Sequence, residues 1–277
     1  MTSAEIPSLP GPALLFCPAD RPDRYTKALA AADAVILDLE DGVGADGKDA
    51  ARAALVAADL DPARVIVRVN AIGTPEHAAD IVAVRQTGYR QVMLPKTETG
   101  AQLDALGRDW RVVALCETPL GIVNAAEIAA APGVVAVMWG AEDLIAAMRG
   151  RTSRRPDGRY RDVALHARSA VLLAAAAHGR PAIDAIYANI LDLDGLAAEA
   201  QDAAASGFTH KGCIHPSQVA VVRKAFRADE AQAAWARRVL AAARDAGARD
   251  KGAVKVDGQM IDAPLIRQAE AIIASLR

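Results

Sequence analysis

Short apolar runs alternate along the chain with longer stretches that are rich in alanine and charged residues. The runs contain many Val, Ile and Leu residues, which suit strands, whereas alanine favours helices. The pattern predicts strands at Ala13–Cys17, Ala34–Leu39, Arg64–Val69, Gln91–Leu94, Arg111–Cys116, Val134–Trp139, Ala182–Tyr187 and Phe208–Ile214. It predicts helices between them, among others at Arg24–Ala32, Pro75–Gln86, Gly121–Ala130, Asp162–His178 and Asp194–Ala204.

Eight strands that alternate with helices indicate parallel βαβ units. Eight is also the strand number of a TIM barrel, whose usual length is close to that of this chain of 277 residues. We therefore predict an α/β protein, a (β/α)₈ TIM barrel with a short C-terminal extension. An open doubly wound sheet shows the same alternation and is the alternative. We assign residues 1–223 to the barrel and residues 224–277 to a helical extension that carries Gly258-Gln-Met-Ile-Asp262.

Polar and charged residues gather where the predicted strands end. They occur in Asp38-Leu-Glu-Asp41, Arg68-Val-Asn70, Pro95-Lys96, Cys116-Glu-Thr118 and Gly140-Ala-Glu-Asp143. In a barrel of parallel strands the carboxyl ends converge on one face, and the loops of that face build active sites. The pattern therefore indicates an enzyme.

Composition narrows the range of partners. The 32 basic and 34 acidic residues nearly balance, which argues against nucleic acid or a membrane surface as the main partner. The three cysteines lie far apart in the sequence, as expected for reduced thiols rather than for disulfides. The first residues show no signal-peptide pattern, and no apolar stretch is long enough to span a bilayer. We expect a cytoplasmic protein.

Glu117 comes directly after a predicted strand, and Asp143 comes shortly after the next one. Both carboxylates should therefore lie on the loop face. Two carboxylates, together with waters and a chelating substrate, suit octahedral Mg²⁺. The alternative is that each residue caps the helix that follows it. The histidines are scattered without metal-ligand spacing, so zinc is not expected.

Arg68 lies in the apolar run Val65-Ile-Val-Arg-Val-Asn70 and needs a partner, because an unpaired buried charge is costly. Its guanidinium suits a substrate carboxylate. It could equally pair with Glu40 or Asp41 from the preceding strand end. Both readings are compatible with one site.

Two further basic segments have ambiguous patterns. Arg21, Arg24 and Lys27 recur at a spacing of three near a helix start and could bind phosphates, or form a solvated helix face. The segment Arg149–Arg161 could be a mobile lid or a basic surface loop.

The segment Gly42-Val-Gly-Ala-Asp-Gly-Lys48 nearly matches a phosphate-binding loop but continues with Asp49 instead of Ser or Thr. We interpret it as a flexible loop, with nucleotide hydrolysis a weak alternative.

Seven motifs in order along the chain carry a family resemblance: Val35-Ile-Leu-Asp-Leu-Glu-Asp-Gly-Val43, Val67-Arg-Val-Asn70, Met93-Leu-Pro-Lys96, Glu117-Thr118, Trp139-Gly-Ala-Glu-Asp-Leu144, Cys213-Ile-His-Pro-Ser-Gln218 and Gly258-Gln-Met-Ile-Asp262. Together they resemble the citrate lyase β-subunit-like (CitE-like) proteins of the HpcH/HpaI aldolase/citrate lyase family, relatives of malyl-CoA and citramalyl-CoA lyases. The resemblance extends from about Leu14 to Ala269. It implies a TIM barrel, a homotrimer, Mg²⁺ as cofactor and a CoA thioester as substrate.

The resemblance also implies roles for individual residues. Glu117 and Asp143 match the family's metal ligands, and Arg68 matches the arginine that holds the keto-acid carboxylate. Glu117, Gly140 and Ala141 are assigned with Arg68 to substrate binding, and Arg21, Arg24 and Lys27 match the region that contacts CoA. Asp262 matches an aspartate that longer lyases lend as acid/base from a neighbouring subunit. Its alternative role is to cap the last helix. Glu40 and Asp41 complete the expected catalytic set.

The expected reaction is Mg²⁺-dependent cleavage or condensation of a β-hydroxyacyl-CoA, such as malyl-CoA, citramalyl-CoA or hydroxymethylglutaryl-CoA, with acetyl-CoA and a keto acid as products. Two alternatives remain at this point. The chain could be a carrier-dependent acyl lyase subunit of a larger complex. It could also be a metal-dependent aldolase that uses no CoA. This chain is shorter than typical malyl-CoA lyases before the Met-Ile-Asp motif, so the path of Asp262 to an active site is open.

Overall fold

The computed structural model describes residues 9–245, 247 and 253–276. The first residues of the chain, on which the expectation about a signal peptide rests, lie outside this part. The described chain forms two compact units, Met1–Val222 and Arg223–Arg277, with the division inside helix α10. None of the described helices has the length and apolar character needed to cross a membrane.

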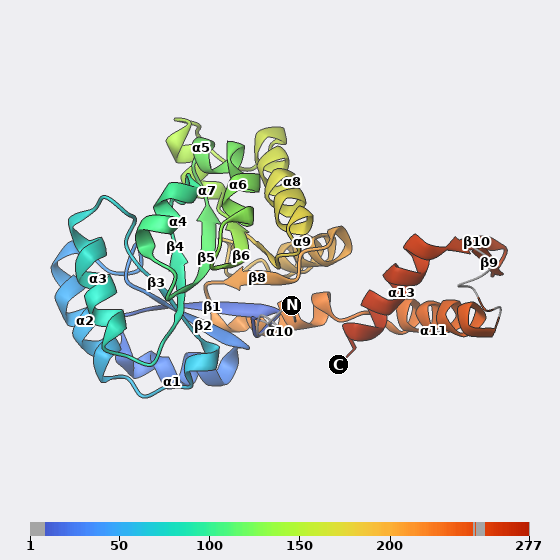
Figure 1. The fold of residues 1–277 in the computed structure, drawn as a ribbon, viewed down its shortest axis with the longest axis horizontal. Coiled ribbons are helices and arrows are strands. Elements are labelled where there is room, and N and C mark those ends of the chain that lie inside the picture. Colours follow the sequence, from blue (N-terminus) through green and yellow to red (C-terminus); the bar gives the residue numbers. More distant parts are fainter. Residues whose placement is uncertain (1–8, 246, 248–252, 277) are drawn as a thin grey trace. The chain divides into compact units, whose positions relative to one another are not determined.

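Unit 1 is a closed barrel of eight parallel strands in chain order (Figure 1). The strands are β1 (Ala13–Pro18), β2 (Ala34–Asp38), β3 (Val65–Arg68), β4 (Gln91–Leu94), β5 (Arg111–Cys116), β6 (Val134–Trp139), β7 (Ala182–Asp184) and β8 (His210–Cys213). β8 pairs with β1 and closes the ring, which confirms the predicted TIM barrel and excludes the open sheet.

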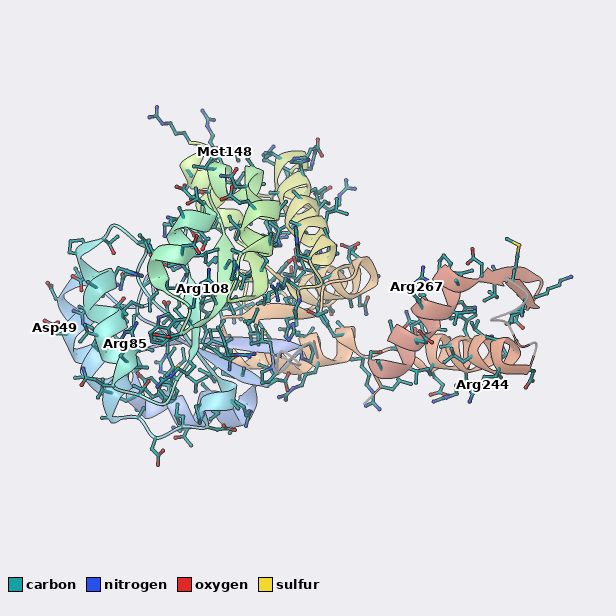
Figure 2. The ribbon with its side chains drawn as sticks, in the orientation of Figure 1. Asp49, Arg85, Arg108, Met148, Arg244 and Arg267 are labelled. Carbon is teal, nitrogen blue, oxygen red and sulfur yellow. The ribbon has the colours of Figure 1, made fainter. Side chains whose placement is uncertain are left out.

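Helices surround the barrel strands (Figure 1). They are α1 (Pro22–Ala31), α2 (Lys48–Ala57), α3 (Pro75–Arg85), α4 (Gly100–Leu106), α5 (Pro119–Val123), α6 (Ala125–Ala130), α7 (Ala141–Ala147), α8 (Asp162–Ala177), α9 (Leu193–Ser206) and α10 (Pro216–Phe226), with short 3₁₀ turns η1 (Ala45–Gly47) and η2 (Pro62–Arg64). Charged side chains such as Asp49 point outward from this layer (Figure 2). The apolar strand residues therefore form the core, and charge is left to the outer surface and the loop face.

The barrel interior explains why the strands were recognisable. Leu14, Ile36, Ile66, Met93 and Ile183 belong to one buried cluster contributed by different strands. Every residue of β2 and of β6 is buried, because a parallel barrel strand is covered by the interior on one side and by helices on the other. Such strands appear in the sequence as continuous apolar runs.

Most predicted bounds agree with the structure to within two residues, and two predicted elements differ by more or are divided. The seventh strand ends at Asp184 rather than at Tyr187, because beyond this point the carbonyls of Ala185 and Tyr187 accept hydrogen bonds from the side chains of Lys211 and Gln218. The predicted helix Gly121–Ala130 is divided into α5 and α6 at Asn124. There, the Asn124 side chain donates a hydrogen bond of 2.8 Å to the carbonyl oxygen of Glu98 instead of facing solvent.

Unit 2 has a core of its own. Helices α11 (Glu230–Asp245) and α13 (Ala263–Ala274) and the hairpin of β9 (Ala253–Val256) with β10 (Gln259–Asp262) bury Ala236, Val239, Ile261 and Ala269 together. Asp257 and Gly258 connect the strands and both have positive φ, of 49° and 84°. A two-residue Asp-Gly turn of this kind matches the twist of a hairpin. After this turn, β10 leads directly into α13, and Asp262 is its last residue before the helix.

Candidate active site

The charged residues of the loop face come from consecutive strands of the barrel. Asp38 ends β2, Arg68 ends β3, Lys96 follows β4, Glu117 follows β5, and Asp143 lies in the first turn of α7 after β6. Parallel strands bring these positions to one mouth of the barrel. The structure thus joins Glu117, Asp143 and Arg68, as the sequence predicted for the loop face.

Arg68 is held by Asp38 in a two-bond contact. Its Nε and one terminal nitrogen donate to the two carboxylate oxygens of Asp38 at 2.7 and 2.6 Å. The other terminal nitrogen lies 3.0 Å from Oε2 of Glu40, and the guanidinium lies 5.0 Å from the ring centre of Phe16. Two-bond pairing of this kind fixes both the position and the plane of the guanidinium.

The predicted partners of Arg68 are therefore partly corrected. Glu40 is confirmed as a partner of Arg68, but the main partner is Asp38. Asp41 is exposed. The reason is strand register, because Asp38 and Arg68 are directly paired residues of β2 and β3. Their side chains point to the same side of the sheet at neighbouring positions. A catalytic role for Asp41 stays a prediction.

Glu40 joins the two basic residues of the mouth. One carboxylate oxygen accepts a short hydrogen bond from Lys96 Nζ, and the other lies beside Arg68 without a well-directed hydrogen bond. Burial raises the pKa of Glu40, an effect that Arg68 and Lys96 oppose. Glu40 is thus a buried acid whose charge depends on its two cationic neighbours.

Glu117 and Asp143 flank the ammonium group of Lys96. Lys96 Nζ lies 4.0 Å from Oε1 of Glu117 and 3.7 Å from Oδ1 of Asp143, and the backbone N–H of Lys96 donates to Glu117 at 3.1 Å. Burial, followed by the negative charges of Asp143 and Glu40, raises the pKa of Glu117 to about 8. A cation placed between these acids lowers this pKa and is stabilised in return.

The acids of the mouth outnumber its bases. Asp38, Glu40, Glu117 and Asp143 stand against Arg68 and Lys96, a formal excess of two negative charges among these contacting residues. This excess matches the charge of Mg²⁺, and Lys96 already places an ammonium next to Glu117 and Asp143. Glu117 and Asp143 both offer carboxylate oxygens, the donor atoms that Mg²⁺ prefers. The residues therefore fit the predicted metal.

The donor set is open rather than closed. Among residues 9–245, 247 and 253–276, no group of three or more His, Cys, Asp or Glu side chains is arranged to hold a metal ion. Glu117 and Asp143 would supply two of the octahedral positions of Mg²⁺ and leave the others to water and substrate oxygens. This arrangement suits a metal that binds substrate directly.

Gly140 supports Glu117 by its lack of a side chain. A Cβ at position 140 would lie 2.8 Å from both Cβ and Oε2 of Glu117, closer than such atoms approach. The Gly140 backbone N–H also donates to the carbonyl of Cys116 at 3.2 Å, which joins the ends of β5 and β6. Ala141 is buried and begins α7. Substrate contacts of Gly140 and Ala141 stay predictions.

The predicted CoA-binding residues lie at the start of α1, directly after β1. Arg24 and Lys27 are exposed, and Arg21 is half-exposed and pairs with Asp23 at 3.2 Å. Their position follows the carboxyl end of a barrel strand, as for the other residues of this face. Neither phosphate binding nor a purely solvated face is tested by these contacts.

Asp262 lies in unit 2 and caps α13. Its Oδ1 accepts from the backbone N–H of Leu265 at 3.5 Å, and Pro264 occupies the first turn. The capping role is therefore confirmed. The acid/base role stays a prediction.

A second buried polar network lies beside the mouth. Asp184, at the end of β7, accepts hydrogen bonds from Trp139 Nε1 at 2.7 Å, Arg168 Nε at 2.9 Å and Lys211 Nζ at 2.9 Å. The positive charges of Lys211 and Arg168 hold the pKa of Asp184 below its usual range against the effect of burial, which is the largest single influence. This network fixes the ends of β6, β7 and β8 relative to α8.

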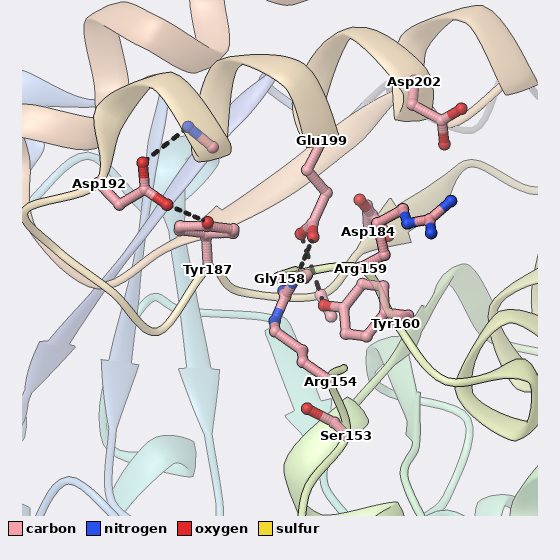
Figure 3. A network of polar contacts seen from close by, with 12 residues as sticks. Ser153, Arg154, Gly158, Arg159, Tyr160, Asp184, Tyr187, Asp192, Glu199 and Asp202 are labelled. Atoms are coloured by element: carbon pink, nitrogen blue, oxygen red, sulfur yellow. Dashed lines mark hydrogen bonds and ion pairs between the residues drawn. The ribbon is translucent and has the colours of Figure 1, made fainter. Parts of the chain in front are cut away.

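The same network anchors the segment Arg149–Arg161 (Figure 3). Arg154 pairs with Glu199 of α9 at 2.7 Å, and its guanidinium lies 3.9 Å from the ring centre of Tyr160 and 4.8 Å from that of Tyr187. Glu199 in turn accepts from Lys211 at 2.9 Å. Arg154 is therefore a structural anchor, which the sequence pattern of a basic surface loop did not indicate.

Lys48 is another residue whose role the sequence did not indicate. The segment Gly42–Lys48 is not an open loop, because it forms η1 and α2 begins at Lys48. Lys48 Nζ donates to the carbonyls of Leu39 and Glu40 at 2.6 and 2.7 Å and to Asn70 Oδ1 at 3.0 Å. The lysine thus holds the ends of β2 and β3 together. In this position it is engaged by the protein rather than by a phosphate.

A closed (β/α)₈ barrel with an acid-rich mouth and a fixed arginine defines a TIM-barrel enzyme suited to a cation and a small anionic substrate. The family model described as HpcH/HpaI aldolase/citrate lyase matches residues 13–216. The chain belongs to this family, which confirms the predicted resemblance and the prediction of a lyase.

Individual relatives cover nearly the whole chain. The citrate lyase subunit beta-like protein of Mycobacterium tuberculosis is 57% identical over 264 residues, which are 95% of this chain and 94% of the relative. The crystal structure of CitE from Mycobacterium tuberculosis, in complex with magnesium, acetoacetate and coenzyme A, has a TM-score of 0.91 and 55% identity and covers 96% of this chain and 98% of its own. A (3S)-malyl-CoA thioesterase of Cereibacter sphaeroides is 34% identical over 257 residues, 90% of this chain and 88% of the relative. Magnesium in the solved relative confirms the predicted cofactor at the level of the family.

Gly140→Ala tests the support of Glu117. The added methyl group displaces Glu117, so we expect Mg²⁺ affinity to fall by roughly tenfold or more, the usual cost of a lost support for a metal ligand. Isothermal titration calorimetry measures this affinity. Gly44→Ala is the matched control, because a Cβ at position 44 meets nothing within 4 Å. Equal Mg²⁺ affinity in both variants would contradict the assignment of Glu117 as a metal ligand that Gly140 supports.

Proposed function

We propose that this protein is a Mg²⁺-dependent CoA-thioester lyase that cleaves or condenses a β-hydroxyacyl-CoA. Malyl-CoA, citramalyl-CoA and hydroxymethylglutaryl-CoA are the candidate substrates, and acetyl-CoA and a keto acid are the products. The observation that carries the proposal is the juxtaposition of Arg68, fixed by Asp38, with the open carboxylate pair Glu117 and Asp143. Magnesium, acetoacetate and coenzyme A in the solved relative support the same class of substrate.

Glu117 and Asp143 would hold Mg²⁺, which when bound supplies Lewis acidity toward substrate oxygens. Arg68 would pair with the substrate carboxylate through the terminal nitrogen that faces Glu40, since its other edge is engaged by Asp38. Fixing the carboxylate sets the orientation of the carbon–carbon bond that breaks. Glu40 would hold the positions of Arg68 and Lys96, and the exposed Asp41, next to Glu40 in the chain, would complete the catalytic set.

Asp262 would move the proton at the methyl carbon of the acetyl group. In cleavage the substrate hydroxyl loses its proton to solvent as the carbon–carbon bond breaks, and the carboxyl group of Asp262 gives a proton to the carbon that leaves the keto acid. In condensation its carboxylate takes that proton from acetyl-CoA, and the new hydroxyl takes a proton from solvent. The proposal places Asp262 in the site of a neighbouring subunit of a homotrimer, as the family resemblance implies.

The phosphates of CoA would be held by Arg21, Arg24 and Lys27, since exposed guanidinium and ammonium groups suit such anions. The three cysteines are buried and form no disulfide, which supports a reducing, cytoplasmic compartment.

Turnover of the purified protein tests the reaction class. With Mg²⁺ we expect acetyl-CoA and a keto acid from at least one of the three candidate thioesters, and loss of this activity with a chelator. Asp143→Asn should remain folded and lose Mg²⁺-dependent turnover by at least about a hundredfold, because one metal ligand is weakened. Absence of turnover on all three thioesters with folded protein would instead favour the carrier-dependent subunit.

The double variant Arg21→Ala/Lys27→Ala separates the CoA lyase from a CoA-independent aldolase. Loss of two cationic partners of a phosphate should raise the KM for the acyl-CoA roughly tenfold or more and leave thermal stability nearly unchanged, since the side chains lie on the surface. Steady-state kinetics and thermal melts measure both effects. An unchanged KM would favour the aldolase without CoA.

Asp262→Asn separates the proposed acid/base role from helix capping. Asn caps a helix as well as Asp does, so the free energy of unfolding should change little, whereas kcat should fall by about a hundredfold or more. A mixture of the Asp262→Asn and Glu117→Gln variants, assembled by co-expression, should regain activity if a site takes its residues from two subunits. Full activity of Asp262→Asn alone would contradict the assignment.

A further inference from the structure

The side chain of Lys96 has no place in the reaction as proposed, although it lies at the centre of the acid cluster. Its Nζ bonds to Glu40 and lies 4.0 Å from Glu117 and 3.7 Å from Asp143. Two of these three acids are the candidate ligands of Mg²⁺. The ammonium group of Lys96 and a bound metal ion would therefore interact with the same two carboxylates.

The backbone of Lys96 is held in an unusual conformation that keeps it in this position. Its φ is 50°, in the left-handed region that a residue with a side chain seldom occupies. In this conformation the Lys96 N–H donates to Glu117 Oε1 at 3.1 Å, while the side chain reaches Glu40. Lys96 thus contacts Glu117 with its backbone and faces it with its charge.

Lys96 differs from Arg68 in its freedom to move. The Arg68 side chain is 11% exposed and is fixed by two bonds to Asp38, whereas the Lys96 side chain is 36% exposed and has one close partner, Glu40. A lysine ammonium is a compact charge on a flexible stem, so it can shift without leaving Glu40. Of these two cations, Lys96 is the one that can respond to a change in the charge of the cluster.

We propose that Lys96 is a built-in counter-cation of the metal site, which competes with Mg²⁺ for Glu117 and Asp143 and withdraws along Glu40 when the metal binds. This inference rests on the proposed metal site. An ammonium and a divalent ion around the same carboxylates repel each other strongly at separations near 4 Å. Lys96 therefore lowers the affinity of the site for Mg²⁺, and it offsets part of the negative charge of the acids when no metal is bound.

The competing explanation is that Lys96 only braces the end of β4 against Glu40. The two explanations predict opposite signs. If Lys96 is a brace, removal of its amine loosens the site and weakens Mg²⁺ binding or leaves it unchanged. If Lys96 is a counter-cation, removal of its positive charge leaves the acids uncompensated and strengthens Mg²⁺ binding.

Titration of the full-length protein with Mg²⁺ by calorimetry at low ionic strength distinguishes the two. We expect Lys96→Met to bind Mg²⁺ roughly tenfold more tightly than the unmodified protein, and Lys96→Arg, which keeps the charge, to stay within a few-fold of it. Lys96→Gln should repeat the Lys96→Met result and serves if that variant does not fold, as judged by circular dichroism. The rise in Tm on addition of Mg²⁺ should be larger in both neutral variants.

Glu117→Gln in the same titration separates this inference from the metal site itself. Loss of Mg²⁺ binding in Glu117→Gln, with unchanged or weaker binding in Lys96→Met and Lys96→Gln, would overturn the role of Lys96 and leave the metal site standing. Mg²⁺ binding by Glu117→Gln at the affinity of the unmodified protein would overturn both. Tighter binding in the neutral variants, together with its loss in Glu117→Gln, is the result expected here.

Discussion

The mouth of the barrel depends on an uncompensated negative charge. In the part of the chain that the structure describes, four carboxylates at the ends of β2 and β5 and in the first turn of α7 meet two side-chain cations, Arg68 and Lys96, and most of these groups are withdrawn from water. A buried cluster of this kind must bind a proton or a further cation. The raised pKa of Glu117 is one response, and the divalent ion proposed for this site would be the other. The two responses exclude each other at Glu117, so the proposed metal binding is linked to protonation there.

The neighbouring network around Asp184 shows the contrast. There, Asp184, Glu199 and Asp202 are matched by Arg154, Arg168 and Lys211, so the acids and bases are equal in number. Lys211 is fully buried, and each of its three contacts is with an oxygen atom at 2.8 to 2.9 Å. Such a network needs no outside ion and fixes the chain. The balance of charge, rather than the mere presence of buried ionisable groups, thus separates the candidate active site from its framework.

Most of the fold was predictable because each barrel strand is buried on both faces and appears as an apolar run. The position of Glu117 and Asp143 at the barrel mouth was predictable because both follow such runs, and their binding of Mg²⁺ stays a proposal. The partner of Arg68 was not, because the alignment of Asp38 with Arg68 depends on the register between β2 and β3, which a sequence does not state. The same limit hid the anchoring roles of Lys48 and Lys211, although the position of Lys211 inside a predicted strand already indicates a buried partner. The acid/base role proposed for Asp262 depends on assembly, which the sequence of one chain does not state.

The basic side chains Arg68 and Arg168 respond differently to salt from Arg24 and Lys27. Arg68 and Arg168 are shielded from solvent and bonded directly to carboxylates, so dissolved ions hardly weaken their contacts. Arg24 and Lys27 stand in water on α1, where physiological ionic strength screens charges beyond about 8 Å. If α1 binds a phosphate-bearing molecule as proposed, a rise in ionic strength weakens that binding, whereas the ion pairs of Arg68 inside the barrel persist. Salt then acts first on the proposed binding of a large anionic ligand and only later on the architecture and on the proposed orientation of a small acid.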